Sequence, residues 1–142
     1  MPTLYFTIGL PGSGKSTTAR RMVAESGGTI REVTKDDLRL RPEAPKSRGK
    51  QERWVVAERD RQVIEAFTQG CSIVVHDTNF NPVHRTRLEA IAAEYGANFE
   101  VLDFTHVDVH ECIRRDAGRP QPVGEKVIRE MWQRYLRTPP TS

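Results

Sequence analysis

The sequence contains little cysteine and no long apolar run. Its 142 residues include two cysteines, Cys71 and Cys112, which are too few for a disulfide framework. No apolar stretch approaches the roughly 18–20 residues that a membrane-spanning helix requires. A strand-like segment begins almost at the N-terminus, where a secretory leader would need a charged and then an apolar region. We therefore expect a cytoplasmic protein that does not associate with membranes.

Lysine is scarce in comparison with arginine. Of the 22 basic residues, 17 are arginine and 5 are lysine, and the net charge is +3. Such a bias suits a protein that handles phosphate, because a guanidinium group binds phosphate through two parallel hydrogen bonds. A GC-rich or thermally adapted genome would produce the same bias. Composition alone leaves both explanations open.

Strand-like and helix-like segments alternate along a chain whose length fits one domain. The expected strands are 3–9, 30–33, 72–76 and 98–104, and the expected helices are 15–26, 36–40, 50–69, 82–95, 108–116 and 124–137. This alternation predicts an α/β fold with a central parallel sheet of about four strands and helices on both faces. Residues 1–137 form the expected domain, and residues 138–142 a tail or linker.

The segment GLPGSGKS, residues 9–16, matches the pattern G-x-x-x-x-G-K-[ST] completely. Its glycines allow a tight turn whose N–H groups point at phosphate, and the helix that follows adds the positive end of its dipole. We expect Lys15 to reach the β- and γ-phosphates of ATP or another nucleoside triphosphate, and Ser16 to bind Mg²⁺. The alternative is a fortuitous glycine-rich turn. The expected nucleotide-binding residues are Gly9, Pro11, Gly12, Ser13, Gly14, Lys15, Ser16 and Thr17.

The segment HDTNFNP, residues 76–82, begins where a buried strand ends. Asp77 therefore lies at the carboxyl edge of the sheet, where open α/β sheets bind ligands. A carboxylate there can hold a water molecule on Mg²⁺, as a Walker-B acid does. The alternative is an Asx-turn from strand to helix, since Asp, Asn and Pro are common turn residues. Thr78, Asn79 and Asn81 are compatible with both interpretations.

The segment TKDDLR, residues 34–39, follows the second expected strand. Asp36 and Arg39 are three residues apart and share one face of a helix. A carboxylate held by an arginine can accept the proton of a reacting hydroxyl group. The alternative is an exposed surface ion pair of little energetic value. Thr34 and Asp37 have the spacing of a capping box, which predicts that Asp37 caps the helix.

The segment IRRDAGRPQP, residues 113–122, gathers Arg114, Arg115 and Arg119 around a glycine- and proline-containing stretch after a helix. Mobile arginines above a phosphate-binding loop can close on the triphosphate and stabilise the charge of the transition state. This pattern predicts an arginine-bearing lid. The alternative is a charged helix end followed by an ordinary loop.

Two smaller groups of residues have weaker patterns. His106, His110 and Cys112 are close in sequence, but they match no structural-zinc or H-E-x-x-H spacing, so we do not expect a metal site there. Trp54 and Trp132 could stack on bases. Their amphipathic spacing favours packing instead.

Together these segments resemble the 5′-polynucleotide kinase domain of phage and bacterial end-healing enzymes. The shared features, in order, are TIGLPGSGKST, KDDLR, HDTNFNP, AEYGANFEV and the arginine-rich segment that ends at Arg119. They extend over about residues 3–137. The phosphate-binding loop alone is generic, whereas the ordered combination is specific. The resemblance implies a P-loop kinase fold in a bacterial or phage-infected cell.

The resemblance also implies a role for each matched residue. Asp36 corresponds to the general base, Arg39 to the residue that contacts a phosphate of the acceptor, and Asp77 to the acid of the DTN element. Arg115 and Arg119 correspond to the lid arginines. The implied reaction transfers the γ-phosphate of ATP, with Mg²⁺, to 5′-hydroxyl ends of DNA or RNA. The family's phosphatase domain has no counterpart in these residues, so we expect either a stand-alone kinase or an excised module of a larger enzyme. A phosphatase or ligase module that acts in the same pathway is the expected partner.

Two other functions remain open at this point. One is a small-metabolite kinase of the gluconate or nucleoside type, and the other is a P-loop NTPase that acts as a switch. A polynucleotide kinase needs an open, basic groove beside Asp36, whereas a metabolite kinase needs a closed pocket. A switch needs no acceptor base.

Overall fold

The computed structural model describes residues 1–137, so the expected tail or linker at 138–142 lies outside the described residues. Four parallel strands form one sheet in the order β2 (Ile30–Val33), β3 (Ser72–Val75), β1 (Thr3–Ile8) and β4 (Asn98–Asp103). β1 and β3 are the central strands, and Phe6 is paired with Val75. Strands in parallel sheets are covered on both faces, which explains their nearly continuous apolar sequences.

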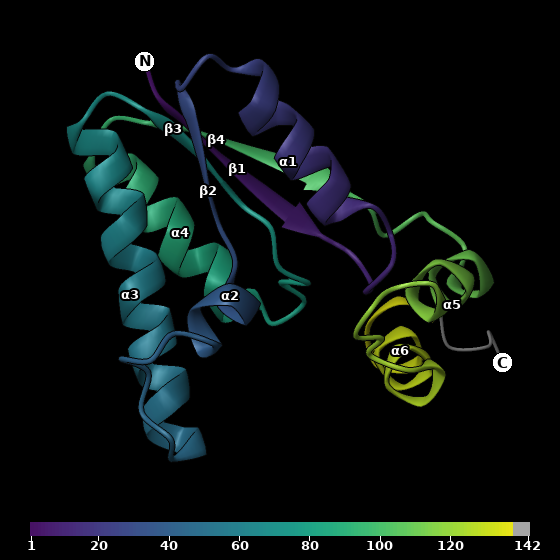
Figure 1. Ribbon diagram of the computed structural model, residues 1–142. Helices are drawn as coiled ribbons and strands as arrows, with labels where there is room; N and C mark the ends of the chain where they lie inside the picture. Colours follow the sequence, from purple (N-terminus) through teal and green to yellow (C-terminus); the bar gives the residue numbers. More distant parts are fainter. Residues whose placement is uncertain (138–142) are drawn as a thin grey trace, which may run out of the picture.

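Helices cover both faces of the sheet, as the alternating pattern predicts (Figure 1). α1 (Lys15–Glu25) lies on one face, and α3 (Arg48–Thr68) and α4 (Pro82–Glu94) lie on the other. The main core is buried between the sheet and these last two helices. It contains Leu4, Phe6, Val33, Leu38, Val55, Val63, Ala66, Phe67, Ile73, Val75, Leu88 and Ile91.

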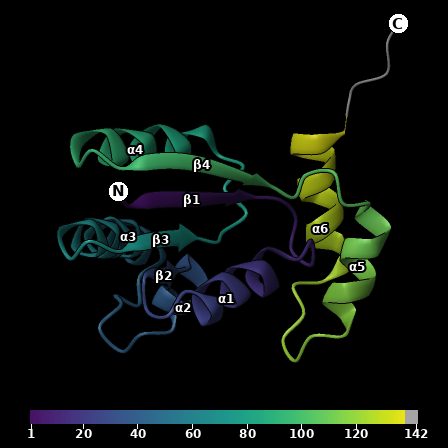
Figure 2. The ribbon, with the colours of Figure 1, turned by 90° about the horizontal axis from the view of Figure 1, so that it is seen from above.

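A second, smaller core lies beyond the carboxyl ends of the strands. α5 (Val109–Ala117), α6 (Glu125–Met131) and a π-helical turn (Trp132–Leu136) stand there side by side (Figure 2). We call residues 109–136 the lid. The buried side chains of the small core are Leu10, Val109, Cys112 and Ile128, and Leu10 comes from the phosphate-binding loop, not from the lid. The lid therefore packs on that loop through a core of its own.

The expected helix 124–137 is divided in the structure. α6 ends at Met131, and the π-helical turn follows. In this turn Trp132 and Leu136 pack on the small core, while Tyr135 stacks on Phe80 with ring centroids 4.9 Å apart. Contacts with a distant segment thus decide the helix end, and a 3.6-residue periodicity does not encode them. The other differences are shifts of element ends by one or two residues.

The short helix α2 (Lys35–Arg39) follows β2 directly and packs against α3. It places the KDDLR segment at the same edge of the sheet as the phosphate-binding loop (Figure 1). Among the helices of residues 1–137, none is long and apolar enough to cross a membrane.

Candidate active site

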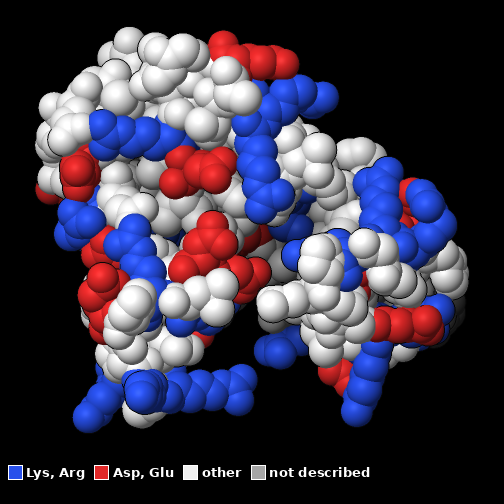
Figure 3. All heavy atoms as spheres, in the orientation of Figure 1, with Lys and Arg blue, Asp and Glu red and all other residues white. Residues whose placement is uncertain are grey.

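A cleft of about 1050 Å³ lies at the carboxyl ends of the strands, between the sheet and the lid. In Figure 3 it is the gap between the two parts of the molecule, and both acidic and basic side chains border it. Every expected site residue except Gly9 lines it: Pro11, Gly12, Ser13, Gly14, Lys15, Ser16, Thr17, Asp36, Arg39, Asp77, Arg115 and Arg119. Four segments far apart in sequence therefore meet at one place.

The phosphate-binding loop depends on its glycines for two different reasons. Gly12 and Gly14 have φ values of 82° and 102°, which residues with a side chain rarely adopt. A Cβ atom on Gly12 would also lie 2.3 Å from the carbonyl oxygen of Cys112 in α5. Gly9 lies under the loop, where a Cβ atom would be 2.7 Å from that of Phe104. Gly9 therefore serves packing, and Gly12 serves both the turn and the contact with the lid.

Lys15 is folded into the loop. Its side chain donates a hydrogen bond to the carbonyl oxygen of Leu10 at 2.7 Å, and Nζ lies 3.5 Å from Ser13 Oγ. The residue is 7% exposed, and this burial lowers the pKa of Lys15 to about 8. A phosphate group near Nζ would favour the charged form. The lysine thus contacts the loop itself, and among residues 1–137 it forms no ion pair with a carboxylate.

Asp77 connects the ends of β2 and β3. Its Oδ1 accepts hydrogen bonds from the Thr34 hydroxyl group (3.0 Å) and from the Lys35 backbone N–H (2.9 Å). The expected capping box of Thr34 and Asp37 is therefore wrong, because the Thr34 hydroxyl group donates to the buried carboxylate of Asp77, which caps α2 from another strand. Asp77 Oδ2 is buried and has no hydrogen-bond partner within the described part of the chain.

The loop after β3 is fastened to the sheet by side chains. The Thr7 hydroxyl group donates to the carbonyl oxygen of Asp77 at 2.9 Å, and the Asn79 amide donates to the carbonyl oxygen of Thr7 at 2.8 Å. Asn79 has a φ of 52°, a conformation that Asn tolerates better than most residues. Asn81 accepts from the Val83 N–H and caps α4. The turn-forming role is confirmed for Asn81, while Asp77 is more than a turn residue.

Asp36 and Arg39 form the expected pair on one face of α2. Arg39 Nη1 lies 2.6 Å from Asp36 Oδ1, and the Asp36 side chain is 81% exposed at the rim of the cleft. Arg39 also donates to Glu52 of α3, with Nε 2.7 Å from Oε1. The hydrogen bonds between them raise the pKa of Arg39 and lower the pKa of Glu52. Sequence analysis missed Glu52, because nothing in the sequence links it to a helix thirteen residues earlier.

A buried polar row lies behind α2 and was also missed. Arg59 is fully buried, and its guanidinium group donates to Asp60 Oδ1 at 3.0 Å and lies 2.9 Å from His84 Nδ1. His84 Nε2 in turn is 3.2 Å from Lys35 Nζ. Burial, together with the neighbouring cations, lowers the pKa of His84 to about 4. The row connects α2, α3 and α4, so it supports the helix that carries Asp36.

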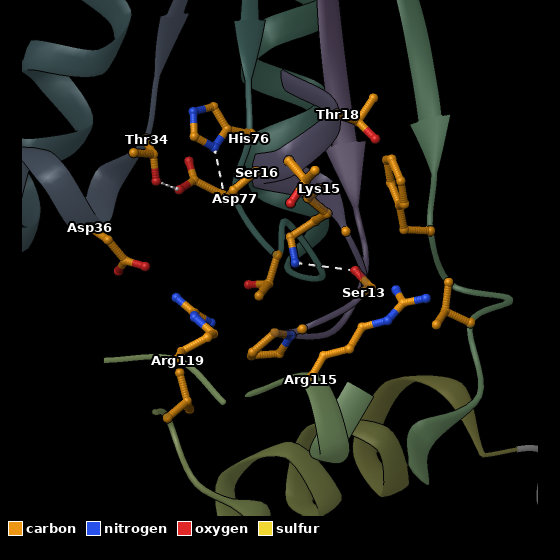
Figure 4. Close-up of a pocket in the computed structure, with 18 of the residues that line it drawn as sticks. Ser13, Lys15, Ser16, Thr18, Thr34, Asp36, His76, Asp77, Arg115 and Arg119 are labelled. Carbon is orange, nitrogen blue, oxygen red and sulfur yellow. Dashed lines mark hydrogen bonds between the residues drawn. The ribbon is translucent and has the colours of Figure 1, made fainter. Parts of the chain in front are cut away.

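The lid brings two arginines to the cleft (Figure 4). Arg115 is paired with Glu111 at 2.9 Å and Arg119 with Asp116 at 3.3 Å. Asp116 is buried and accepts hydrogen bonds from the backbone N–H groups of Val123 and Gly124. It therefore shapes the turn that follows Arg119, a role that sequence analysis did not assign.

The weaker sequence patterns have structural explanations. Within residues 1–137, no three His, Cys, Asp or Glu side chains are placed to share a metal ion. Cys112 is part of the small core, and His106 lines the cleft. Trp54 packs on the main core and Trp132 on the small one, which confirms the packing interpretation for both.

Comparison with known proteins agrees with this geometry. A family model described as an AAA domain matches residues 4–139. The chain belongs to this family. With its phosphate-binding loop and parallel sheet, it is a nucleotide-binding P-loop enzyme of the kinase type.

The comparisons also found a similar curated protein and similar solved structures. An L-seryl-tRNA(Sec) kinase of Methanococcus maripaludis is 26% identical over 136 residues, which are 93% of this chain and 52% of the relative. A structure of the Pnkp1/Rnl/Hen1 RNA repair complex is 24% identical, with a TM-score of 0.76 over 94% of this chain and 44% of the other. A second structure of the Pnkp1/Rnl/Hen1 complex is 26% identical, with a TM-score of 0.69 over 84% and 40%. The chain thus spans about half the length of these relatives, or less.

Proposed function

We propose that this P-loop kinase is an ATP-dependent polynucleotide 5′-hydroxyl kinase. The observation that carries the proposal is the position of Asp36, whose carboxylate is exposed at an open rim of the cleft, beside Arg39. A small metabolite would need a closed pocket, whereas the end of a long chain needs an opening through which the rest of the chain can leave. A carboxylate at the place of an acceptor base also favours a kinase over a switch, which needs no such base.

The donor nucleotide occupies the phosphate-binding loop in this proposal. The loop N–H groups and Lys15 hold its phosphates, and Arg115 and Arg119 approach from the lid. Ser16 Oγ and the partnerless Asp77 Oδ2 are oxygen atoms of the kind that Mg²⁺ binds directly or through water, so the residues present fit this ion. Bound there, Mg²⁺ would neutralise charge that develops on the transferring phosphoryl group.

The acceptor occupies the opposite side of the cleft. Asp36 accepts the proton of the 5′-hydroxyl group as its oxygen attacks the γ-phosphorus in line with the leaving group. Arg39 holds a phosphate of the acceptor, and Glu52 fixes the arginine's orientation from α3. The buried row of Arg59 and His84 keeps α2, and therefore Asp36, in place.

The first turns of α3 and the residues just before them provide a path for the rest of the nucleic-acid strand. Lys46, Arg48, Lys50 and Arg53 are exposed, and none has a carboxylate within ion-pair distance among the described residues. Figure 3 shows basic side chains gathered at this end of α3. Such a surface attracts a phosphodiester backbone without reading its sequence. It continues from α2, so a strand held by Arg39 can extend along it.

A second acceptor has support from a specific observation. The curated relative is an L-seryl-tRNA(Sec) kinase, and it matches 93% of this chain. A serine hydroxyl group carried by a tRNA would also approach an open, basic cleft. The Pnkp1 neighbour is part of an RNA repair complex, so both candidates place the reacting hydroxyl group on RNA. For the polynucleotide kinase, a ligase or phosphatase module in the same pathway is the proposed partner.

The acceptor can be identified by one assay with matched substrates. The protein is incubated with γ-labelled ATP and Mg²⁺, and with a 5′-hydroxyl RNA or DNA oligonucleotide, the same oligonucleotide already 5′-phosphorylated, a seryl-tRNA, gluconate or a nucleoside. We expect label on the 5′-hydroxyl oligonucleotides and none on the phosphorylated ones. Label on the seryl-tRNA alone would replace the polynucleotide with the second candidate. Label on a metabolite alone, or ATP hydrolysis without any acceptor, would contradict both.

A further inference from the structure

His76 lies directly behind the phosphate-binding site, although the proposed reaction assigns it no role. It follows β3 and is buried. Its Nδ1 is 3.3 Å from the hydroxyl oxygen of Ser16, and Figure 4 shows this contact between the two side chains. Its Nε2 is buried without a hydrogen-bond partner in the described residues, and Glu32 Oε2 lies 4.0 Å away.

The arrangement determines which atom of His76 carries the proton. A neutral imidazole ring has one N–H donor and one acceptor nitrogen. The Glu32 carboxylate favours the proton on the nitrogen that faces it, Nε2. Nδ1 is then the acceptor, and the Ser16 hydroxyl group donates to it. The Ser16 proton points toward β3 as a result, and the lone pairs of its oxygen face the cleft.

The geometry points to His76 as a positioning residue that presents the Ser16 oxygen to the Mg²⁺ ion of the bound nucleotide. Asp77 cannot take the Ser16 proton through Oδ1, because Thr34 and the Lys35 N–H already occupy that atom. Its Oδ2 remains free for the hydration shell of the ion. The adjacent residues His76 and Asp77 thus divide two tasks between them, one orienting a metal ligand and the other holding metal-bound water.

This inference rests on the nucleotide and Mg²⁺ part of the proposed function, and it is independent of the acceptor. The residues that orient a metal ligand typically contribute about 10- to 100-fold to metal affinity. Among the described residues, the one hydrogen bond between His76 and the phosphate-binding loop is the bond to Ser16. Its loss should therefore weaken the effect of Mg²⁺ on nucleotide binding without weakening metal-free binding.

The test measures binding of a fluorescent, non-hydrolysable ATP analogue in EDTA and in a series of Mg²⁺ concentrations. For His76→Leu we expect the wild-type affinity in EDTA and a rise of about 10- to 100-fold in the Mg²⁺ concentration that half-saturates the enhancement. His76→Asn retains an acceptor oxygen near the position of Nδ1, so it should restore most of the enhancement. Ser72→Ala, which removes a side-chain hydrogen bond at the far end of the same strand, should leave the Mg²⁺ response unchanged.

A double-mutant cycle separates positioning from packing. If His76 acts through Ser16, then His76→Leu should add no further loss of Mg²⁺ enhancement to Ser16→Ala. Additive losses, or equal losses of affinity with and without Mg²⁺ in His76→Leu, would show that His76 only packs. The absence of any Mg²⁺ enhancement in the wild-type protein would also overturn the inference. Kinase activity is not needed for any of these outcomes.

Discussion

The two walls of the cleft, the phosphate-binding loop and the lid, differ in how deeply their side chains are buried. The phosphate-binding wall rests on the main core, and its Lys15 is only 7% exposed. The lid rests on a core with four buried side chains, one of which belongs to the opposite wall. The side chains of Arg115 and Arg119 are 46% and 47% exposed. The phosphate-binding wall is therefore part of the larger core, while the lid rests on a smaller one.

The difference in burial predicts a difference in mobility between the two walls. Regions with few buried apolar contacts open at a lower free energy than the core of the same protein. A kinase must admit its nucleotide and then exclude water, so we expect the lid to be the moving wall and the phosphate-binding loop the fixed one. The contact of Gly12 with the Cys112 carbonyl group is where the moving wall meets the fixed one.

The largest effect is expected on the fixed wall. Lys15→Ala removes the one charge that is buried within the loop, so we expect phosphoryl transfer to fall by at least about 10³-fold. The main core is untouched, so the thermal midpoint should stay near that of the wild type. Steady-state kinetics and calorimetry check both expectations. Near-normal turnover in a well-folded variant would remove the basis for a phosphate-binding loop.

The next largest effect is expected on the acceptor side, where Asp37→Asn serves as the matched control for Asp36→Asn. Asp36→Asn should lower kcat by about 10²–10⁴-fold, the usual contribution of general acid–base catalysis. Nucleotide affinity should not change, because the loop is intact. Asp37 is exposed, and its side chain makes no hydrogen bond with another residue of 1–137, so Asp37→Asn should leave activity near the wild-type level. An inactive Asp37→Asn beside an active Asp36→Asn would place the base on the other carboxylate.

Effects on the moving wall should be smaller and should appear in kcat rather than stability. Arg115→Ala and Arg119→Ala each remove one exposed charge from the lid, and we expect kcat to fall by about 10²-fold. Arg114 lies on the same helix, is paired with Glu111 and does not line the cleft, so Arg114→Ala is the control. If all three variants lose the same activity, the lid arginines act only through general charge.

The smallest effect on kcat is expected for substitutions in the two cores, which can be compared directly. Leu4→Ala in the main core should cost about 2–5 kcal/mol of global stability and leave the kcat of the folded fraction unchanged. Leu10→Ala in the small core should cost less global stability but loosen the lid, and so lower kcat modestly. Denaturant unfolding and hydrogen exchange of α5 measure the two. Equal losses of global stability would mean that the lid and the sheet unfold as one unit.

The sequence by itself determined the parts that depend on short-range patterns. Apolar runs and helical periodicity gave the order of strands and helices, because each element buries one face or two. The spacing from Gly9 to Ser16 predicted the loop, since a loop that wraps phosphate is a local structure. The pairing of Asp36 with Arg39 followed from helical geometry alone. Their catalytic roles remain predictions.

Only the tertiary structure decided which distant groups form hydrogen bonds or ion pairs with each other. The Thr34 hydroxyl group was expected to cap its own helix, yet it donates to Asp77 because a buried carboxylate of a neighbouring strand competes for it. Glu52 reaches Arg39, and His76 reaches Ser16, across intervals of 13 and 60 residues. No local pattern marks such pairs, because hydrogen-bond partners are set by which strand ends and helices the fold brings within about 3 Å of each other.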